Sequence, residues 1–265
     1  MKHPSIFAFT DCKDSNALTR LFVRLTALFN GSHIKTVGID KDIEAAGCIL
    51  DTLDALRLGT GDYIIIGNLA PREHKQYKNG APFCVAHVDG TIIIATKTCF
   101  SLLRKLDLIN TIGETDVETV CKAFLSEEET ARIANSQFRS FEYVPLLARF
   151  AADEKDIPMT QDTLESFSPE KFENQIWWID NFGNAKTTFT NNEIKNRVSN
   201  ETVTLILNNT EHVFPFFDQL ADVPTGTVAC IIGSSGYKDV RFAEIVKQGA
   251  SVAQALGLSV GDRIS

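Results

Sequence analysis

Two kinds of apolar spacing alternate through the first half of the chain, and this alternation constrains the fold more than any other feature. Ser5–Thr10, Ile34–Ile39 and Tyr63–Gly67 are apolar runs of strand length. Between them, Leu18–Phe29 and Asp42–Leu58 carry apolar residues at helical spacing. Strands that alternate with helices in this way predict an α/β fold. The run Tyr63–Gly67 is apolar throughout, which predicts a central strand that is covered on both faces.

The pattern changes after about residue 153. Before that point, Asp89-Gly90 predicts a two-residue hairpin turn between Phe83–Val88 and Thr91–Ala95. We also expect helices over Cys99–Leu106, Asp116–Asn135 and Glu142–Ala152. Residues 153–174 are charged and poor in apolar side chains, and short strands follow them. The sequence therefore predicts an N-terminal domain of residues 1–155, a linker of residues 156–174 and a C-terminal domain of residues 175–265.

The composition excludes several classes of function. A formal net charge of −8 argues against nucleic-acid binding, which requires basic side chains to neutralise phosphates. No apolar stretch approaches the roughly 20 residues of a membrane span. The six cysteines are scattered without a C-x-x-C pair and are interpreted as reduced core residues, so a cytoplasmic location is expected. No phosphate-loop, zinc-hydrolase or serine-hydrolase motif is present, and no metal site is predicted.

The last third of the chain carries two specific segments. The first is Trp177-Trp178-Ile179-Asp180-Asn181-Phe182-Gly183-Asn184. The second begins with Ser234-Ser235-Gly236-Tyr237, continues through Phe242-Ala243-Glu244-Ile245 and ends in Gly257-Leu258-Ser259-Val260-Gly261-Asp262. Taken alone, the first segment is compatible with a simple turn in which Gly183 supplies a positive φ. Together the two segments resemble the C-terminal domain of the S-adenosylmethionine hydroxide adenosyltransferases, the family that includes the fluorinase and chlorinase enzymes.

This resemblance implies a fold, an activity and an assembly. The implied fold is an α/β domain with a mixed sheet, followed by a small β-barrel domain. The implied reaction is cleavage of S-adenosylmethionine to adenosine and L-methionine by water or hydroxide at the ribose C5′ carbon. S-adenosylmethionine is then the substrate or ligand, and no separate cofactor is expected. Family members are similar in forming homotrimers, with each site between the N-terminal domain of one subunit and the C-terminal domain of its neighbour.

The resemblance also assigns ligand-binding residues. Asp11 matches the acidic residue that binds the ribose, although a helix-entry cap is an alternative role for it. Asp180 matches the aspartate that holds the methionine ammonium, and Asn184 matches the asparagine that contacts the base. Phe182 would flank the ligand, and Ser234 and Ser235 occupy the serine position that meets the methionine carboxylate. Asp14 or Asn16 stands in for a second polar residue after the first strand, and Asp14, Ser15 or Asn16 can cap the helix that follows.

The departures from the family pattern fall on the catalytic residues. Asn68 replaces an aspartate after the third strand, and Arg72 is the candidate for the arginine that follows it. Arg139 in Phe138-Arg139-Ser140 replaces the histidine that helps to position the attacking water. Neither an amide nor a guanidinium acts as a base near neutral pH. Hydrolysis is therefore expected to be slow, and the alternative is an inactive family member that binds S-adenosylmethionine or adenosine as a sensor.

Overall fold

The computed structural model describes residues 3–69 and 81–265. The chain divides into two compact units, each with its own core. The N-terminal unit consists of Met1–Ile49 and Leu56–Pro169, and the C-terminal unit consists of Leu50–Ala55 and Glu170–Ser265.

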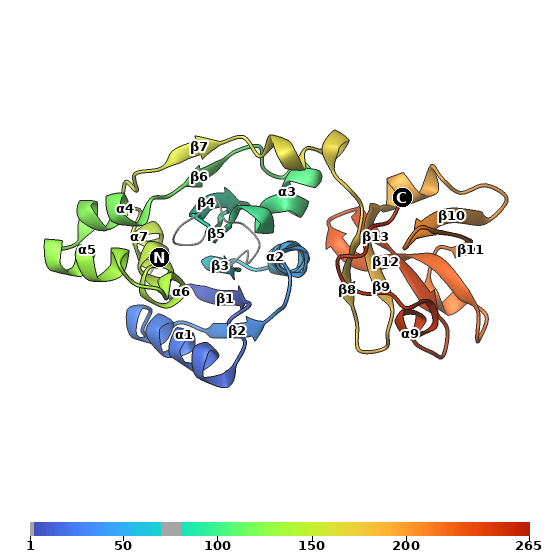
Figure 1. Ribbon diagram of the computed structural model, residues 1–265, viewed down its shortest axis with the longest axis horizontal. Coiled ribbons are helices and arrows are strands. Elements are labelled where there is room, and N and C mark those ends of the chain that lie inside the picture. Colours follow the sequence, from blue (N-terminus) through green and yellow to red (C-terminus); the bar gives the residue numbers. More distant parts are fainter. Residues whose placement is uncertain (1–2, 70–80) are drawn as a thin grey trace. The chain divides into compact units, whose positions relative to one another are not determined.

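A seven-stranded mixed sheet forms the centre of the N-terminal unit, in the order β2-β1-β3-β5-β4-β6-β7 (Figure 1). The strands are β1 (Ser5–Thr10), β2 (Ile34–Gly38), β3 (Tyr63–Asn68), β4 (Phe83–Val88), β5 (Thr91–Thr96), β6 (Ile112–Glu114) and β7 (Thr160–Asp162). Strands β2, β1, β3 and β5 run parallel, whereas β4, β6 and β7 pair antiparallel with their neighbours. The predicted α/β domain with a mixed sheet is therefore confirmed.

Helices cover both faces of this sheet, which explains the apolar sequence of its central strand. The α-helices are α1 (Ser15–Leu28), α2 (Asp42–Leu56), α3 (Ser101–Lys105), α4 (Val117–Phe124), α5 (Glu127–Ala134), α6 (Arg139–Glu142) and α7 (Val144–Ala152). Short 3₁₀ turns span η1 (Lys97–Phe100), η2 (Glu165–Phe167) and η3 (Pro169–Lys171). Apolar side chains of α1, α4 and α7 share one core with Ile64 and Ile66 of β3. On the opposite face, α2 lies against Gly67 through Ile49, and Ile65 is fully buried.

One predicted turn is confirmed, and the structure differs from the predicted secondary structure at two places. The Asp89-Gly90 hairpin is confirmed, and both turn residues have positive φ, as a primed turn requires. The helix predicted over 116–135 is two helices, because Leu125 is extended and Ser126 begins α5 with a capping box. Within the predicted linker, Thr160–Asp162 pairs with Ile112–Glu114 as β7 on β6. Strands of three residues carry too little periodicity to be recognised from sequence.

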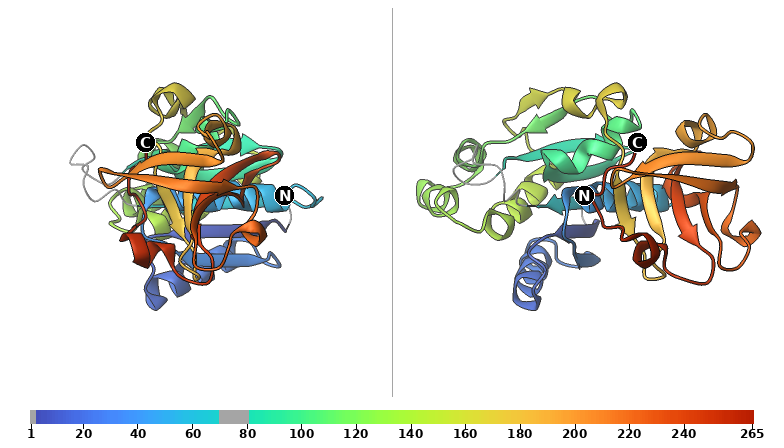
Figure 2. Two further views of the ribbon diagram at one scale, coloured as in Figure 1. Left: turned by 90° about the vertical axis from the view of Figure 1, so that its right-hand side faces the viewer. Right: turned by 45° about the vertical axis from the view of Figure 1, so that its right-hand side comes forward.

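The C-terminal unit is a curled six-stranded sheet in the order β10-β11-β12-β13-β9-β8, and the left view of Figure 2 faces its strands (yellow to red). The elements are β8 (Ile176–Ile179), β9 (Ala185–Thr190), α8 (Asn191–Lys195), β10 (Thr202–Leu207), β11 (Thr210–Phe217), η4 (Leu220–Asp222), β12 (Val228–Tyr237), β13 (Val240–Lys247) and α9 (Val252–Leu256). The last residues of the chain link the two edge strands. Arg263 bridges to Gln175 beside β8, and Ile264 bridges to Leu207 of β10. This barrel-like sheet agrees with the small β-domain that was expected.

None of the helices in the described part of the chain is both long enough and apolar enough to cross a bilayer. All six cysteines are free thiols, and four of them are buried.

Candidate functional site

The N-terminal unit contains a pocket of about 600 Å³ at the carboxyl ends of β1, β3 and β5. Asp11 directly follows β1, Asn68 ends β3 and Thr96 ends β5. Parallel strands bring their carboxyl ends to one edge of a sheet, and such edges are the usual binding crevices of α/β folds. The topology therefore gathers polar residues that are far apart in the sequence.

Backbone and side-chain hydrogen bonds hold the β1 and β3 ends of the pocket in place. The Asp11 N–H donates to the carbonyl of Asn68 at 3.2 Å. The Asn68 Nδ2 atom donates to Thr10 Oγ1 at 2.8 Å, and Asn68 is 6% exposed. Because one N–H of the amide is engaged in this way, the amide oxygen and the second N–H of Asn68 remain for a ligand.

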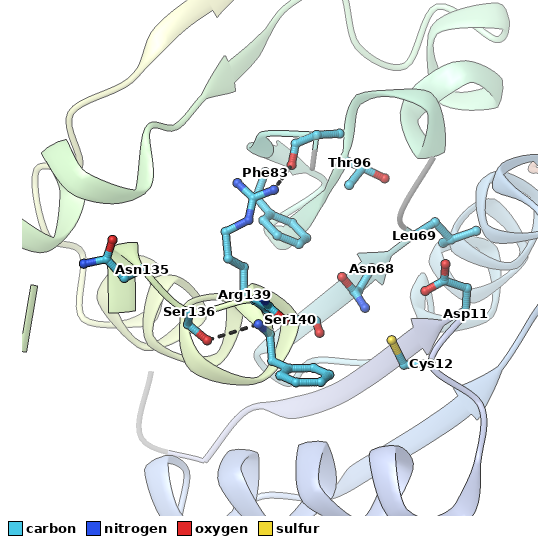
Figure 3. A pocket seen from close by; sticks show the side chains of 13 residues that line it. Asp11, Cys12, Asn68, Leu69, Phe83, Thr96, Asn135, Ser136, Arg139 and Ser140 are labelled. Carbon is cyan, nitrogen blue, oxygen red and sulfur yellow. Dashed lines mark hydrogen bonds between the residues drawn. The ribbon is translucent and has the colours of Figure 1, made fainter. Parts of the chain in front are cut away.

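Arg139 forms the opposite side of the pocket from Asp11, and Asn68 lies between them (Figure 3). Arg139 is the first residue of α6 and is partly buried. Its Nη2 atom donates to the carbonyl of Ala81 at 3.3 Å. Burial lowers the pKa of the Arg139 guanidinium from its ordinary value, although the group stays protonated near neutral pH. The structure thus brings the sequence-predicted residues Asp11, Asn68 and Arg139 to one cavity.

Two other predicted residues, Asp14 and Asn16, do not line this pocket. Asp14 is the N-cap of α1, and its Oδ1 atom accepts from the backbone N–H groups of Asn16 and Ala17 at 3.0 Å. The helix-entry cap is therefore Asp14, and the alternative that Asp11 performs this role is wrong. Neither Asp14 nor Asn16 is among the described residues that line the pocket. Arg72 lies outside the described residues.

Sequence reasoning missed several further lining residues, among them Cys12 and Ser140. Cys12 is partly buried, and burial together with the charge of Asp11 raises the pKa of its thiol. The only sequence signal for either residue is its position next to a predicted site residue, since Cys12 follows Asp11 and Ser140 follows Arg139.

In the C-terminal unit, the segment Asp180–Asn184 folds into a tight turn around the carboxylate of Asp180. Its Oδ1 atom accepts from the N–H groups of Phe182 and Asn184, each at 2.9 Å, and its Oδ2 atom accepts from Asn184 Nδ2 at 3.0 Å. Gly183 has a φ of +83°, which the turn interpretation of this motif predicted. The turn presents the side chain of Phe182, which is 72% exposed.

The two serines of the second segment differ in their surroundings. Ser234 is exposed, whereas Ser235 is 3% exposed and its Oγ atom accepts from Lys186 Nζ at 2.6 Å. The same ammonium lies 3.5 Å from the carboxylate of Glu244, which is 7% exposed. Burial raises the pKa of Glu244, and the neighbouring Lys186 opposes this rise. Lys186 was not predicted, because a single lysine on a strand carries no signal of its own in the sequence.

The described residues include no group of three or more histidine, cysteine, aspartate or glutamate side chains that could hold a metal ion. The described lining of the N-terminal pocket offers one carboxylate, one guanidinium and several neutral hydrogen-bonding groups. This combination can bind a polar small molecule with hydroxyl and charged groups.

Comparisons with known proteins identify the type of the C-terminal domain and similar folds. The family model of the SAM hydroxide adenosyltransferase C-terminal domain matches residues 174–265. Among solved structures, an uncharacterized conserved protein from Thermotoga maritima is similar with a TM-score of 0.68 and 14% identity, over 98% of each chain. A conserved hypothetical protein from Thermus thermophilus is similar with a TM-score of 0.56 and 16% identity, over 98% of each chain.

At these identities the two solved structures show that the fold is shared along the whole chain. No curated protein matches the chain in sequence. The resemblance that the two C-terminal segments predicted is confirmed by the family match. Residues 174–265 therefore form a domain of the S-adenosylmethionine hydroxide adenosyltransferase C-terminal type.

Proposed function

We propose that the protein binds S-adenosylmethionine and cleaves it to adenosine and L-methionine. The observation that carries this proposal is the family match of residues 174–265, which includes the turn around Asp180. A pocket with a carboxylate and a guanidinium at the carboxyl edge of the N-terminal sheet supports it. The working assembly in this proposal is a homotrimer, in which each site combines the N-terminal unit of one subunit with the C-terminal unit of its neighbour.

The binding roles in this proposal follow from the groups that each residue has available. Asp180 holds the methionine ammonium with a carboxylate that the turn already orients. Asn184 contacts the base, and the exposed ring of Phe182 flanks the ligand. The exposed hydroxyl of Ser234 meets the methionine carboxylate more readily than that of Ser235, which is bonded to a lysine. Asp11 accepts hydrogen bonds from the ribose hydroxyls.

The proposed chemistry is an in-line displacement at C5′. The oxygen of water forms a bond to C5′ while the C5′–S bond breaks and its electron pair passes to sulfur. Sulfur leaves as the neutral thioether of methionine, so the leaving group needs no acid, and the proton from water passes to solvent. Asn68 and Arg139 cannot act as bases near neutral pH, so in this scheme they only orient the water. The rate then comes from placement and desolvation, which predicts slow turnover.

A second candidate is a protein that binds S-adenosylmethionine or adenosine without cleaving it, as a sensor. The observation that favours it is the composition of the N-terminal pocket. Its described lining contains no histidine, and Asn68 and Arg139 occupy the positions of the family's aspartate and histidine. Binding is common to both candidates, so it is tested first and turnover second.

Calorimetric titration with S-adenosylmethionine tests binding, and Asp180→Asn is the informative variant. The amide keeps an oxygen for the N–H groups of the turn but removes the charge that the ligand ammonium needs. We expect affinity to fall about 10- to 100-fold, the loss of one charged hydrogen bond. The matched control is Asp262→Asn in the same unit, whose carboxylate accepts from Ser259 N–H and Asn208 Nδ2 outside the turn. A wild-type protein that binds neither S-adenosylmethionine nor adenosine at millimolar concentration would refute both candidates.

Turnover in ¹⁸O-labelled water separates the two candidates. The hydrolase must release methionine and place the label in the 5′-hydroxyl of adenosine, whereas the sensor releases neither product. The pH–rate profile is expected to be flat from about pH 6 to 8, because the described lining of the pocket contains no histidine, the side chain that ordinarily titrates in this window. Arg139→Ala lowers turnover if Arg139 orients the water. A clear inflection near pH 6.5 would show that another residue carries the chemistry.

A monomeric mass by light scattering at micromolar concentration would count against the trimer.

A further inference from the structure

Arg139 differs from the other partly buried arginines in the described part of the N-terminal unit. Arg24, Arg104 and Arg149 each lie within ion-pair distance of a carboxylate, at 3.7, 2.5 and 2.7 Å respectively. Arg139 has no acidic side chain within 4 Å among the described residues, and its hydrogen bond there is one long contact to the carbonyl oxygen of Ala81. A guanidinium offers five N–H donors, and Arg139 lines the pocket, so most of its donors remain for a ligand or water.

A partly buried guanidinium without a neighbouring carboxylate lowers the stability of the folded protein unless an anion binds to it. Removing a charge from water without an opposite charge is unfavourable, and proteins therefore pair their buried charges. The lowered pKa of Arg139 has burial as its largest cause, which agrees with an incompletely compensated charge. Arg20 and Arg132, the exposed arginines nearby, do not have this problem, because their guanidinium groups remain in water.

The pocket also determines where an anion can bind within it. Asp11 lies on the side opposite Arg139 and repels an anion there, while the hydroxyl of Ser140 adds a neutral donor beside Arg139 (Figure 3). A guanidinium presents parallel N–H donors that match the paired oxygens of a carboxylate or phosphate. The volume of about 600 Å³ leaves room for a small molecule that carries such a group.

We infer that the N-terminal pocket is a binding site for a small oxyanion, a carboxylate or a phosphate group, with Arg139 as its anchor. The site lies wholly among residues of the N-terminal unit, and it needs neither S-adenosylmethionine nor the Asp180 turn. The site is in the same pocket as the proposed hydrolysis, in which Arg139 also orients the water. Anion binding there is nevertheless measured without S-adenosylmethionine, so a failure of either proposal can be told from a failure of the other.

Calorimetric titration of the full chain with sodium acetate and with sodium phosphate, in the absence of S-adenosylmethionine, tests this inference. Each anion replaces chloride at constant ionic strength. We expect at least one of them to bind, and Arg139→Gln to weaken that binding about 10- to 100-fold, as for other charged hydrogen bonds. Tighter binding of acetate identifies a carboxylate ligand, and tighter binding of phosphate identifies a phosphate ligand.

Arg132→Gln is the matched control, because it removes the same charge from an exposed side chain of the same unit that does not line the pocket. It should bind the anion within about twofold of the wild type, since exposed charges that are not in contact with a ligand contribute little. If Arg139→Gln does not fold, as judged by its circular dichroism, Arg139→Lys replaces it. The lysine keeps the charge but loses the planar fork, so its binding should still be measurably weaker than that of the wild type. Absence of binding to both anions by the wild type, or equal binding by wild type and Arg139 variant, would overturn the inference.

Discussion

The substitution Gly183→Ala tests whether the Asp180 turn is held by close packing as well as by its hydrogen bonds. Gly183 has a φ of +83°, and a Cβ atom built on it would lie 2.8 Å from the Cα of Ser251. Real Cβ atoms do not approach backbone atoms so closely, so either the turn or the start of α9 must move. Ser251 is the N-cap of α9, and its Oγ atom accepts from the N–H of Gln254 at 3.1 Å. The clash therefore also threatens this cap.

Gly226→Ala is a matched control, because Gly226 has a φ of +81° but nothing within 4 Å of its hypothetical Cβ. Alanine in the left-handed region costs about 1–2 kcal/mol, and the stiffer unfolded chain returns about 0.4–1 kcal/mol, so Gly226→Ala should cost about 1 kcal/mol. Gly183→Ala adds about 1–3 kcal/mol for overpacking and about 1 kcal/mol for a weakened cap. The two variants should therefore differ by about 2–4 kcal/mol.

Urea unfolding followed by tryptophan fluorescence measures this difference in the relevant unit. Both tryptophans of the chain, Trp177 and Trp178, lie on β8 of the C-terminal unit. With a slope of about 2 kcal/mol per molar urea, the midpoint of Gly183→Ala should lie about 1–2 M below that of Gly226→Ala. Equal midpoints for the two variants would refute the packing argument and leave only backbone strain.

Three further substitutions test other buried or capping groups. Tyr143→Phe should lower the free energy of unfolding by about 1 kcal/mol, because the hydroxyl of Tyr143 donates to Thr115 Oγ1 at 2.9 Å in the core; denaturation followed by circular dichroism measures this. Asp116→Ala should cost about 1 kcal/mol near pH 7 through loss of the α4 cap. Hydrogen bonds from the first turn lower the pKa of Asp116 in the folded protein, so its stabilisation is present above about pH 4 and disappears as the pH falls through the folded pKa. The difference between wild type and variant should therefore shrink on acidification, and a constant difference would contradict this. Lys186→Met should cost about 3–5 kcal/mol at pH 7, because it leaves the buried carboxylate of Glu244 without its cation. Burial already raises the pKa of Glu244, and loss of Lys186 should raise this pKa further. The folded variant then favours the protonated carboxyl, so the loss of stability should be smaller at pH 4 than at pH 7. A loss of stability that does not change with pH would argue against this explanation.

The parts of the fold that were predictable from sequence are those with local signals. The hairpin at Asp89-Gly90 follows from the conformational preferences of two adjacent residues. The burial of β3 follows from its continuous apolar run, since a strand covered on both faces needs apolar side chains at every position. The Asp180 turn follows from an aspartate that accepts from nearby N–H groups and a glycine that adopts positive φ.

Tertiary structure decided the features that depend on residues distant in the sequence. Strands β6 and β7 have three residues each and exist because they pair with each other and with the sheet. The engagement of Ser235 by Lys186 depends on the juxtaposition of β9 with β12 and β13, which no local pattern specifies. The sequence alone therefore left both serines as equivalent candidates, and the structure distinguishes them.

The N-terminal pocket shows most clearly which features the sequence determines and which depend on tertiary structure. The residue types at Asp11, Asn68 and Arg139 could be read from the chain, together with the loss of an acid and a histidine relative to the family. Only the parallel pairing of β1 with β3 places Asp11 beside Asn68, and only the packing of α6 brings Arg139 to the same cavity without a carboxylate partner among the described residues. Sequence determines which charges and hydrogen-bonding groups a chain possesses. Their pairing, and therefore the free energy available for binding a ligand, depends on long-range contacts that form only when the sheet and its helices assemble.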